Sequence, residues 1–227
     1  MRARLIDATM TAYLKSDRGR PPVIDNVIRI AGVSRGTFYK YFDTLDEVLA
    51  DIARSTAGEM LTSYARLFGS IDDAAVRLAA GPLMAMARAA MEPAHGAIVA
   101  NADLYDASTG EDPRRRLVED SLNYGRAQGV FRFESLVAAF DLVIGTSVEG
   151  ARRISRSGVL ETSAIRETVA LVLMGLGLDR TAAVRAVAQA WQCLQQAGHQ
   201  LDWWKPVSSA RPESPQPPAP DLEGSAA

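Results

Sequence analysis

Apolar residues recur every three to four positions along almost the whole of this sequence. This spacing places them on one face of an α-helix, whereas a half-buried β-strand would need alternation of period two, which is rare here. Runs of β-branched residues bounded by turns are also missing from the sequence. The sequence therefore predicts an all-α protein.

The pattern and its interruptions predict where the helices begin and end. The first helix should stop before the breaker "SDRGRPP", and Gly32 stands where a left-handed residue would close the second. Thr44 and Glu47 predict a capping box at the start of a long helix, and Pro82 predicts a kink or break in the next one. The expected helices span about 3–15, 23–30, 34–42, 45–68, 72–91, 94–104, 112–128, 134–157, 161–176 and 180–197.

Composition divides the chain into three regions. Residues 1–46 are expected to form an N-terminal domain and residues 47–205 a larger helical domain. Residues 206–227 are rich in Pro, Ser and Ala with almost no large apolar side chain, which predicts a disordered tail.

Charge is distributed unevenly along the chain. Residues 1–42 hold eight Lys or Arg and three Asp, whereas the remainder holds 17 basic and 24 acidic residues, for a net charge of −2. This asymmetry indicates that the N-terminal segment alone meets a polyanion. An ordinary solvated helix surface would explain the charge pattern equally well.

Several function classes find no support in the residues. No apolar run approaches a membrane span and no signal peptide is present, so a cytoplasmic protein without a membrane partner is expected. Cys193 is the single cysteine, and His95 and His199 are the two histidines. Without a Ser/His/acid set, a metal-ligand cluster or a phosphate-binding glycine loop, we predict no cofactor, no metal site and no catalytic residues.

The segment "VSRGTFYKYF" at residues 33–42 concentrates aromatic and basic side chains in a short stretch. At about 100° per residue, Phe38 and Phe42 share one face of a helix, whereas Gly36 and Lys40 lie on the opposite face. Ser34 is a favourable N-cap for this helix. We therefore expect both phenylalanines to point inward and a surface suited to close docking to point outward.

The outward surface has the chemistry of a nucleic-acid contact. Its glycine lets another molecule approach the backbone, and its cationic, phenolic and hydroxyl side chains can reach base edges or phosphates. The helix at 23–30 joins it through a tight turn at Gly32, as in a helix-turn-helix, whose second helix lies in the DNA major groove. The alternative, in which Tyr39 and Tyr41 are half-buried packing residues, suits Tyr41 but not Lys40.

Residues 31–42, "AGVSRGTFYKYF", resemble the DNA-binding signature of the tetracycline-repressor-like (TetR) family of transcriptional regulators. The resemblance in helix number and length extends to about residue 200. It implies a homodimer in which each N-terminal three-helix domain, with its helix-turn-helix, reads half of a palindromic operator. It also implies that the C-terminal helices bind a small effector that changes the spacing of the two DNA-binding domains.

The resemblance assigns roles to individual positions. It implies core packing for Phe38, Phe42, Val27 and Ala31. Together with the outward surface of the helix, it gives a set of seven predicted DNA-contact residues: Ser34, Arg35, Gly36, Thr37, Tyr39, Lys40 and Tyr41.

Two positions depart from the family pattern. Val23 stands at the entry of the second helix, where the family often has a Thr that caps the helix and touches phosphate. Leu45 stands where a Lys frequently begins the fourth helix. We expect Arg20, Arg35 and the basic arm Arg2–Arg4 to supply backbone contacts in their place.

The helices expected at 134–157 and 161–176 are apolar over more than one face, so something must cover both sides of each. In the TetR family the last two long helices of each subunit form a four-helix dimer interface, and the resemblance implies the same here. Three glycines would allow close helix approach: Gly145, Gly150 and Gly175. The alternative is that the helix at 180–197 covers this surface within one chain.

The resemblance places an effector site among the middle helices, where methionines suit irregular apolar ligands. We expect a small, mostly apolar effector, although the same side chains would also serve as ordinary core. The predicted effector-binding residues are Tyr64, Phe68, Met86, Asn101, Tyr105, Asn123 and Tyr124.

The function favoured by these observations is sequence-specific transcriptional regulation, with a repressor released from its operator by the effector. An activator, or a regulator without a small ligand, is an alternative that the sequence does not separate from it. An enzyme built on the helical domain lacks any supporting motif, and a nonspecific nucleoid protein would need a more basic chain.

Overall fold

The computed structural model describes residues 1–16, 21–94, 96, 113–157 and 159–204. All regular structure in these residues is helical, which confirms the predicted all-α class. None of the described helices is both long and apolar enough to cross a lipid bilayer. The predicted tail at 206–227 and most of the predicted helix at 94–104 lie outside the described residues.

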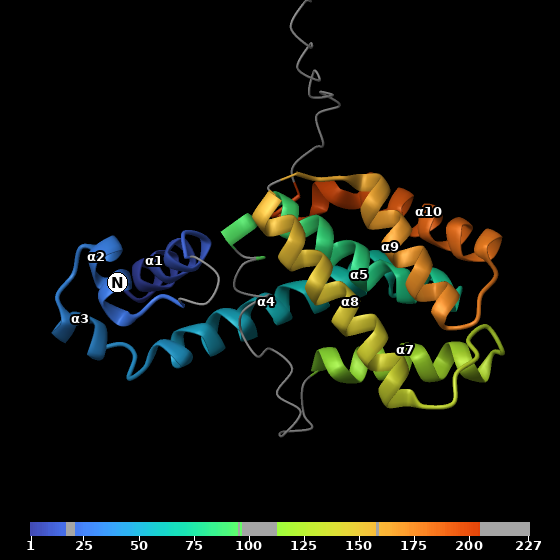
Figure 1. Cartoon of the computed structure of the whole chain (residues 1–227), viewed down its shortest axis with the longest axis horizontal. Coiled ribbons are helices and arrows are strands. Elements are labelled where there is room, and N and C mark those ends of the chain that lie inside the picture. The colour runs from blue at the N-terminus through green and yellow to red at the C-terminus, as the bar shows by residue number, and fades with distance from the viewer. Residues whose placement is uncertain (17–20, 95, 97–112, 158, 205–227) are drawn as a thin grey trace, which may run out of the picture.

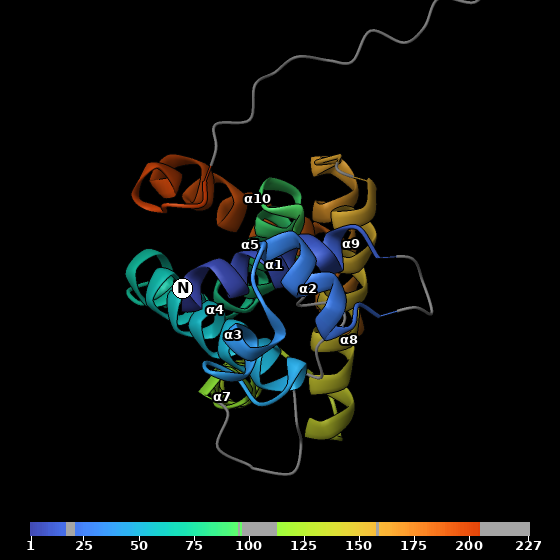
Figure 2. The ribbon, with the colours of Figure 1, turned by 90° about the vertical axis from the view of Figure 1, so that its left-hand side faces the viewer.

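The helices form a small head and a larger body that one long helix connects (Figure 1, Figure 2). The head contains α1 (Arg2–Leu14), α2 (Ile24–Ala31) and α3 (Arg35–Tyr39). The connecting helix is α4 (Leu45–Phe68). The body contains α5 (Ala74–Met91), α7 (Pro113–Ala127), α8 (Leu136–Ser157), α9 (Thr162–Gly175) and α10 (Arg180–Ala197).

The turn between α2 and α3 is built by Gly32 and Ser34. Gly32 ends α2 in the left-handed conformation with φ of 61°, which glycine adopts without steric cost. The Ser34 hydroxyl then caps α3 by accepting a hydrogen bond from the Thr37 N–H at 3.1 Å. Both positions match the expectations from the sequence.

The start of α4 is capped as predicted, with one difference. The Thr44 hydroxyl accepts the N–H of Glu47 at 3.1 Å. The Glu47 carboxylate accepts the N–H of Asp43 at 2.8 Å, whereas a capping box would use the N–H of Thr44. The Glu47 carboxylate therefore accepts the N–H of the residue before the N-cap.

The described α3 is shorter than the predicted helix at 34–42, yet the predicted faces are correct. The N–H groups of Tyr41 and Phe42 both donate to the Phe38 carbonyl, at 2.9 and 3.1 Å, so the chain keeps a helical turn past the end of α3. Phe38 is consequently 0% exposed and Phe42 2% exposed, with their ring centroids 6.2 Å apart. The two phenylalanines anchor α3 from behind.

The buried apolar residues form two separate clusters. The head cluster includes Phe38 and Phe42 and extends into α4 through Val48, Leu49 and Ile52. The body cluster begins on α4 at Tyr64. The first turns of α4 therefore pack with the head, and the division into domains 1–46 and 47–205 stays a prediction.

Helix α5 lies at the centre of the body and packs against α7, α8, α9 and α10. It runs without a break through Pro82, where a kink or break was expected. Gly150 of α8 allows a close approach to α5, since a Cβ at this position would lie 2.5 Å from the Met86 sulfur. Gly150 therefore serves packing between α8 and α5 within the chain.

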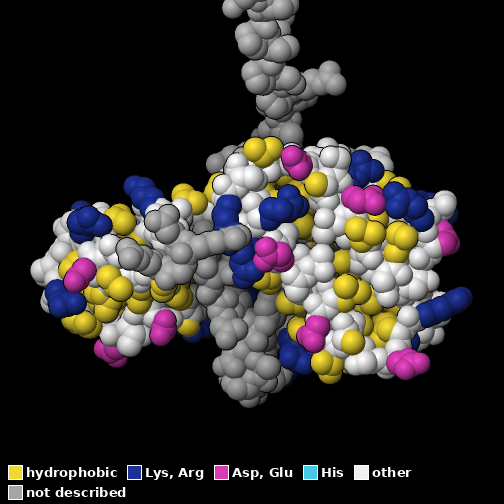
Figure 3. Space-filling view, viewed as in Figure 1, with side chains coloured by type: hydrophobic (Ala, Val, Ile, Leu, Met, Phe, Trp, Pro, Cys, Tyr) yellow, Lys and Arg dark blue, Asp and Glu magenta, His cyan; other side chains and the backbone are white. Residues whose placement is uncertain are grey.

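Helices α8 and α9 retain an apolar surface that the other described residues leave exposed. Val137, Leu142 and Leu171 are 61%, 36% and 54% exposed. Gly145 and Gly175 lie exposed on the same two helices, and hydrophobic side chains emerge over this part of the body in Figure 3. Helix α10, the alternative cover, packs on α5 and α9 and leaves these residues open.

We predict that Phe38→Ala unfolds the head, because removing a buried phenylalanine costs about 3 to 5 kcal/mol. Chemical denaturation followed by circular dichroism should show an early transition for the head helices. Tyr41→Ala is the matched control, since Tyr41 is 38% exposed and its loss should change stability little. Equal stability of the two variants would show that Phe38 does not anchor α3.

Candidate nucleic-acid interface and internal cavity

The outer face of α3 is open to solvent. The Lys40 side chain is exposed and makes no hydrogen bond or ion pair with the described residues. Tyr39 is 48% exposed, and its ring meets the Phe38 ring edge-on with centroids 5.6 Å apart. A Cβ placed on Gly36 would meet nothing closer than the Ser34 hydroxyl at 3.8 Å, so packing within the chain does not require this glycine.

The remaining predicted DNA-contact residues lie beside this face. Ser34, Arg35 and Tyr41 are exposed, and Thr37 is half-buried with its hydroxyl 2.9 Å from that of Ser34. All seven predicted residues therefore lie together on or beside the outer face of α3. Whether they contact DNA stays a prediction.

The arginines expected to supply extra backbone contacts differ in their availability. Arg35 forms an exposed ion pair with Asp25 at 3.2 Å. Arg2 of α1 forms an ion pair with Asp51 of α4 at 2.7 Å, and its guanidinium lies over the Phe42 ring. Arg2 is therefore engaged in a contact between α1 and α4. Arg4 is exposed, and Arg20 lies outside the described residues.

The entry of α2 compensates for the missing Thr cap in another way. Val23 occupies the N-cap position, where its side chain can accept no hydrogen bond. The Asn26 side-chain oxygen accepts the Val23 N–H at 3.0 Å and so satisfies one donor at the helix start. The start of α2 therefore forms without a hydroxyl at the N-cap position.

The body contains a cavity of about 150 Å³ between α4, α5, α7 and α8. Its wall is mostly apolar and includes Met60 and Leu61 of α4, Met84 of α5, Leu117 and Val118 of α7, and Ile144 of α8. A cavity of this size and lining can hold a molecule about as large as benzene. The cavity lies among the middle helices, where the family resemblance implied an effector site.

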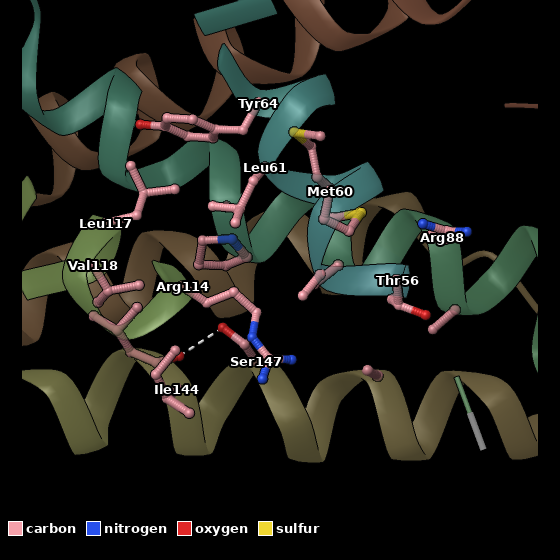
Figure 4. Close-up of a pocket in the computed structure, with 18 of the residues that line it drawn as sticks. Thr56, Met60, Leu61, Tyr64, Arg88, Arg114, Leu117, Val118, Ile144 and Ser147 are labelled. Carbon is pink, nitrogen blue, oxygen red and sulfur yellow. Dashed lines mark hydrogen bonds between the residues drawn. The ribbon is translucent and has the colours of Figure 1, made fainter. Parts of the chain in front are cut away.

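Polar side chains line the cavity along its whole length. Figure 4 shows Thr56 and Arg88 at one end, Tyr64 with Leu117 and Val118 at the other, and Arg114 and Ser147 between them. Thr56 precedes Tyr64 on α4, whose first turns belong to the head core. The end that holds Thr56 and Arg88 therefore lies toward the head.

Arg88 is the charged residue at the end of the cavity nearer the head and is only 6% exposed. Its Nη2 donates to Glu59 of α4 at 2.6 Å, and its Nε donates to Glu92 at 2.9 Å. The guanidinium also lies over the Trp203 ring, with 5.7 Å from Cζ to the ring centroid. Arg88 thus links α4 to the end of α5 and to the last described segment of the chain.

The predicted effector residues separate into three groups. Tyr64 lines the cavity, and its hydroxyl donates to the Arg77 carbonyl at 3.1 Å. Four others lie elsewhere: Phe68 and Met86 in the body core, Asn123 beside Arg126, and Tyr124 with its hydroxyl on the Asp72 carbonyl. Asn101 and Tyr105 lie outside the described residues.

Sequence reasoning missed Arg88 as a cavity residue, although a signal was present. Only Arg77 and Arg88 carry charge in the otherwise apolar sequence of α5. Arg88 follows Gly81 and Met84 by seven and four residues, so it continues the α5 stripe that lines the cavity. A charge on an apolar stripe of a buried helix is a marker of a site.

Comparison with known proteins shows which solved structures share this fold. No protein-family model and no curated protein matches the chain. Among solved structures, RolR in complex with resorcinol superposes with a TM-score of 0.62 at 20% identity, covering 83% of this chain and 93% of that one. The fatty acid degradation regulator FadR from Bacillus halodurans gives 0.62 at 19% identity, covering 78% and 97%.

A TetR family transcriptional regulator from Chloroflexus aurantiacus also superposes, with a TM-score of 0.50 at 19% identity over 86% of this chain and 92% of that one. The chain has the TetR-regulator fold. At these identities the TetR fold is what the comparisons establish.

We predict that Ser34→Ala lowers the free energy of unfolding of the head by about 1 kcal/mol, because α3 loses its N-cap acceptor. Ser34→Asp should retain most of the stability, since a carboxylate caps the same N–H. Urea denaturation of both variants measures the difference. Equal loss in both variants would contradict a capping role for Ser34.

Proposed function

We propose that the chain is a sequence-specific DNA-binding transcriptional regulator, a repressor that a small, mostly apolar effector releases from a palindromic operator. The observation that carries the proposal is the outer face of α3. There Gly36, Tyr39 and Lys40 face solvent while Phe38 and Phe42 hold the helix from behind. Packing within the chain leaves room for a side chain at Gly36. The absence of a side chain there allows another molecule, such as DNA, to approach the α3 backbone closely.

The head geometry supports insertion into a major groove. The major groove of B-DNA is wide enough to admit an α-helix such as α3. In a helix-turn-helix the first helix, here α2, crosses the DNA backbone beside that groove. Exposed Lys40 and Tyr39 are suited to phosphates and base edges, because neither is committed to a polar partner within the described residues. The neighbouring arginines Arg4 and Arg29 are also exposed and add positive charge to the head.

We infer that the functional unit is a homodimer formed by the exposed apolar surface of α8 and α9. Val137, Leu142 and Leu171 would be covered by the same residues of a second copy, and exposed Gly145 and Gly175 leave room for close helix contact. Two heads related by a twofold axis would read two half-sites about 34 Å apart or a multiple of it. A palindromic operator follows from that symmetry.

The cavity supports control by a small ligand. RolR has been solved with resorcinol, a small aromatic molecule, and the present cavity is of a size for one aromatic ring. Since α4 lines the cavity and carries the head, a ligand that favours one arrangement of α4 would change the separation of the two heads. Operator affinity would fall without any change at the DNA contacts.

The DNA-binding assignment can be tested with Tyr39→Ala and Lys40→Ala. An operator is first selected from random-sequence DNA with the intact protein, and the selected sites should be inverted repeats. Each variant should then bind the operator more weakly by roughly 1 to 3 kcal/mol in fluorescence anisotropy, because a base or phosphate contact is lost.

Arg185→Ala is the matched control for these two variants. Arg185 is an exposed cation on α10, which lies in the body away from α3 (Figure 1). Its removal should leave operator affinity unchanged. Wild-type affinity for both α3 variants, with the dimer intact, would refute the assignment of this helix.

The dimer assignment predicts that Leu171→Glu produces a monomer in sedimentation velocity, because the added charge would be buried against the partner copy. Val184→Glu on α10 is the control, since Val184 is 40% exposed and lies outside the proposed interface. A dimer that survives Leu171→Glu, or that dissociates equally in both variants, would place the interface elsewhere.

A further inference from the structure

The last described segment of the chain, residues 198–204, folds back from the end of α10 onto the body. Gly198–Gln200 form a short 3-10 turn, and Leu201 and Trp203 beyond it are only 5% and 4% exposed. A Cβ on Gly198 would lie 2.5 Å from Nε1 of Trp204, so the glycine permits a close turn. Residues 198–204 are called the strap below.

The strap packs on α10 through its aromatic side chains. The chain has three tryptophans, of which one lies on α10 and two in the strap. The ring centroid of Trp204 lies 6.2 Å from that of Trp191 on α10 and 5.9 Å from that of Trp203. Aromatic pairs at this spacing add to the free energy that burial supplies. The strap is therefore a packed part of the body.

The strap also contacts helix α4 directly. Nη1 of Arg66, near the end of α4, donates to the Gln200 carbonyl at 3.2 Å. Figure 2 shows α4 and α10 on the same side of the body, where the two helices pack against each other. The hydrogen bond from Arg66 therefore joins the body end of α4 to the strap.

A second contact between the strap and α4 runs through Arg88 of α5. The guanidinium of Arg88 lies over the Trp203 ring, with 5.7 Å from Cζ to the ring centroid. The same guanidinium donates from Nη2 to Glu59 of α4 at 2.6 Å. Because a cation over the face of tryptophan is attracted to the ring, Trp203 helps to hold the ion-pair partner of Glu59 in place.

These two contacts hold α4 at separate points. Glu59 and Arg66 are two helical turns apart on one face of α4, about 10 Å along the helix axis. A helix held at one point can still tilt about that point. Contacts at two points on one face oppose such a tilt, so they fix the direction in which α4 leaves the body toward the head.

The packed strap leaves one hydrogen-bond donor unsatisfied. Nε1 of Trp203 is buried and has no partner among the described residues. A buried donor without a partner costs free energy, and this cost offsets part of what burial of the strap supplies. A short terminal segment with such a cost can separate from the body while the core stays folded.

We propose that the strap is a conformational device that fixes the direction of α4 and thereby the spacing of the two heads in the dimer. When the strap is packed, Arg66 and Arg88 hold α4 in one direction. When the strap separates, the bond from Arg66 and the support of Arg88 are lost, and α4 tilts relative to the body. The effect on DNA rests on the proposed regulatory function, whereas the effect on α4 does not.

The direction of α4 can be measured by double electron–electron resonance between spin labels on the head and the body. The labels are attached to Asp7→Cys in α1 and Gln189→Cys in α10, two exposed positions, after the native thiol is removed with Cys193→Ser. Labelled chains are mixed with excess unlabelled protein, so that each measured pair lies within one chain.

Two variants remove the contacts of the strap. Arg66→Met removes the bond to Gln200, and Trp203→Leu removes the ring beneath Arg88 while an apolar side chain remains. The head begins about 20 Å along α4 from Glu59, so a tilt of about 10° moves it by about 4 Å. We expect the mean distance to shift, or its distribution to widen, by about that amount in each variant.

Arg66→Met keeps the test decisive if Trp203→Leu fails to melt cooperatively, because Arg66 is exposed and its removal leaves the core intact. Arg180→Met is the matched control. Arg180 is an exposed arginine of α10 that pairs with Glu167 of α9 at 3.3 Å, away from the strap and α4. Its removal should leave the distance distribution at the wild-type value.

An unchanged distance distribution in Arg66→Met would overturn the proposal, and so would an equal change in Arg180→Met. Operator binding by the same proteins tests the proposed function separately. In Arg66→Met the affinity for the complete operator should fall several-fold, whereas the affinity for DNA with one half-site should stay at the wild-type value, because each head is intact and only the spacing has changed.

The two measurements keep the inference and the proposed function apart. A protein whose distances depend on the strap but which binds no operator has the device and lacks the proposed function. A protein that binds its operator while its distances are independent of the strap is a regulator in which other contacts set the direction of α4, and the strap proposal is then wrong.

Discussion

Helix α4 is the element on which the rest of the structure depends. Its first turns bury Val48, Leu49 and Ile52 in the head core, and its last turns bury Tyr64 and Phe68 in the body core. The residues between these clusters line the cavity. One continuous helix therefore belongs to both cores and lines the cavity between them, so it connects the position of the head to the packing of the body.

This arrangement would give a physical route from a ligand in the proposed effector cavity to the proposed DNA-contact surface of α3. A packed helix moves as a unit, so a small shift near Thr56 and Met60 displaces the head at its end. A ligand acts only through a difference in its affinity for the two positions of α4. The ion pair between Arg88 and Glu59 crosses from α5 to α4 at this place, so it is the polar contact that such a shift would strain or relieve.

The head and the cavity differ in how far local sequence rules predict them. The turn at Gly32, the cap at Ser34 and the inward faces of Phe38 and Phe42 depend on residues within ten positions of one another, and all were predicted correctly. The cavity depends on α4, α5, α7 and α8 meeting with small gaps between their side chains. Of the predicted effector residues that the structure describes, Tyr64 lines it, whereas Phe68 and Met86 fill the core.

The sequence by itself determined the all-α class, most of the helix ends and the two sides of α3, because helical periodicity and capping act between neighbouring residues. Only the tertiary structure decided that Gly150 packs on Met86, that Val137 and Leu171 stay uncovered, and that Arg88 lies beside a cavity with one donor unpaired. These outcomes depend on which helices meet and on how closely they pack. An amphipathic pattern shows that a face is buried, and it does not show what the face is buried against.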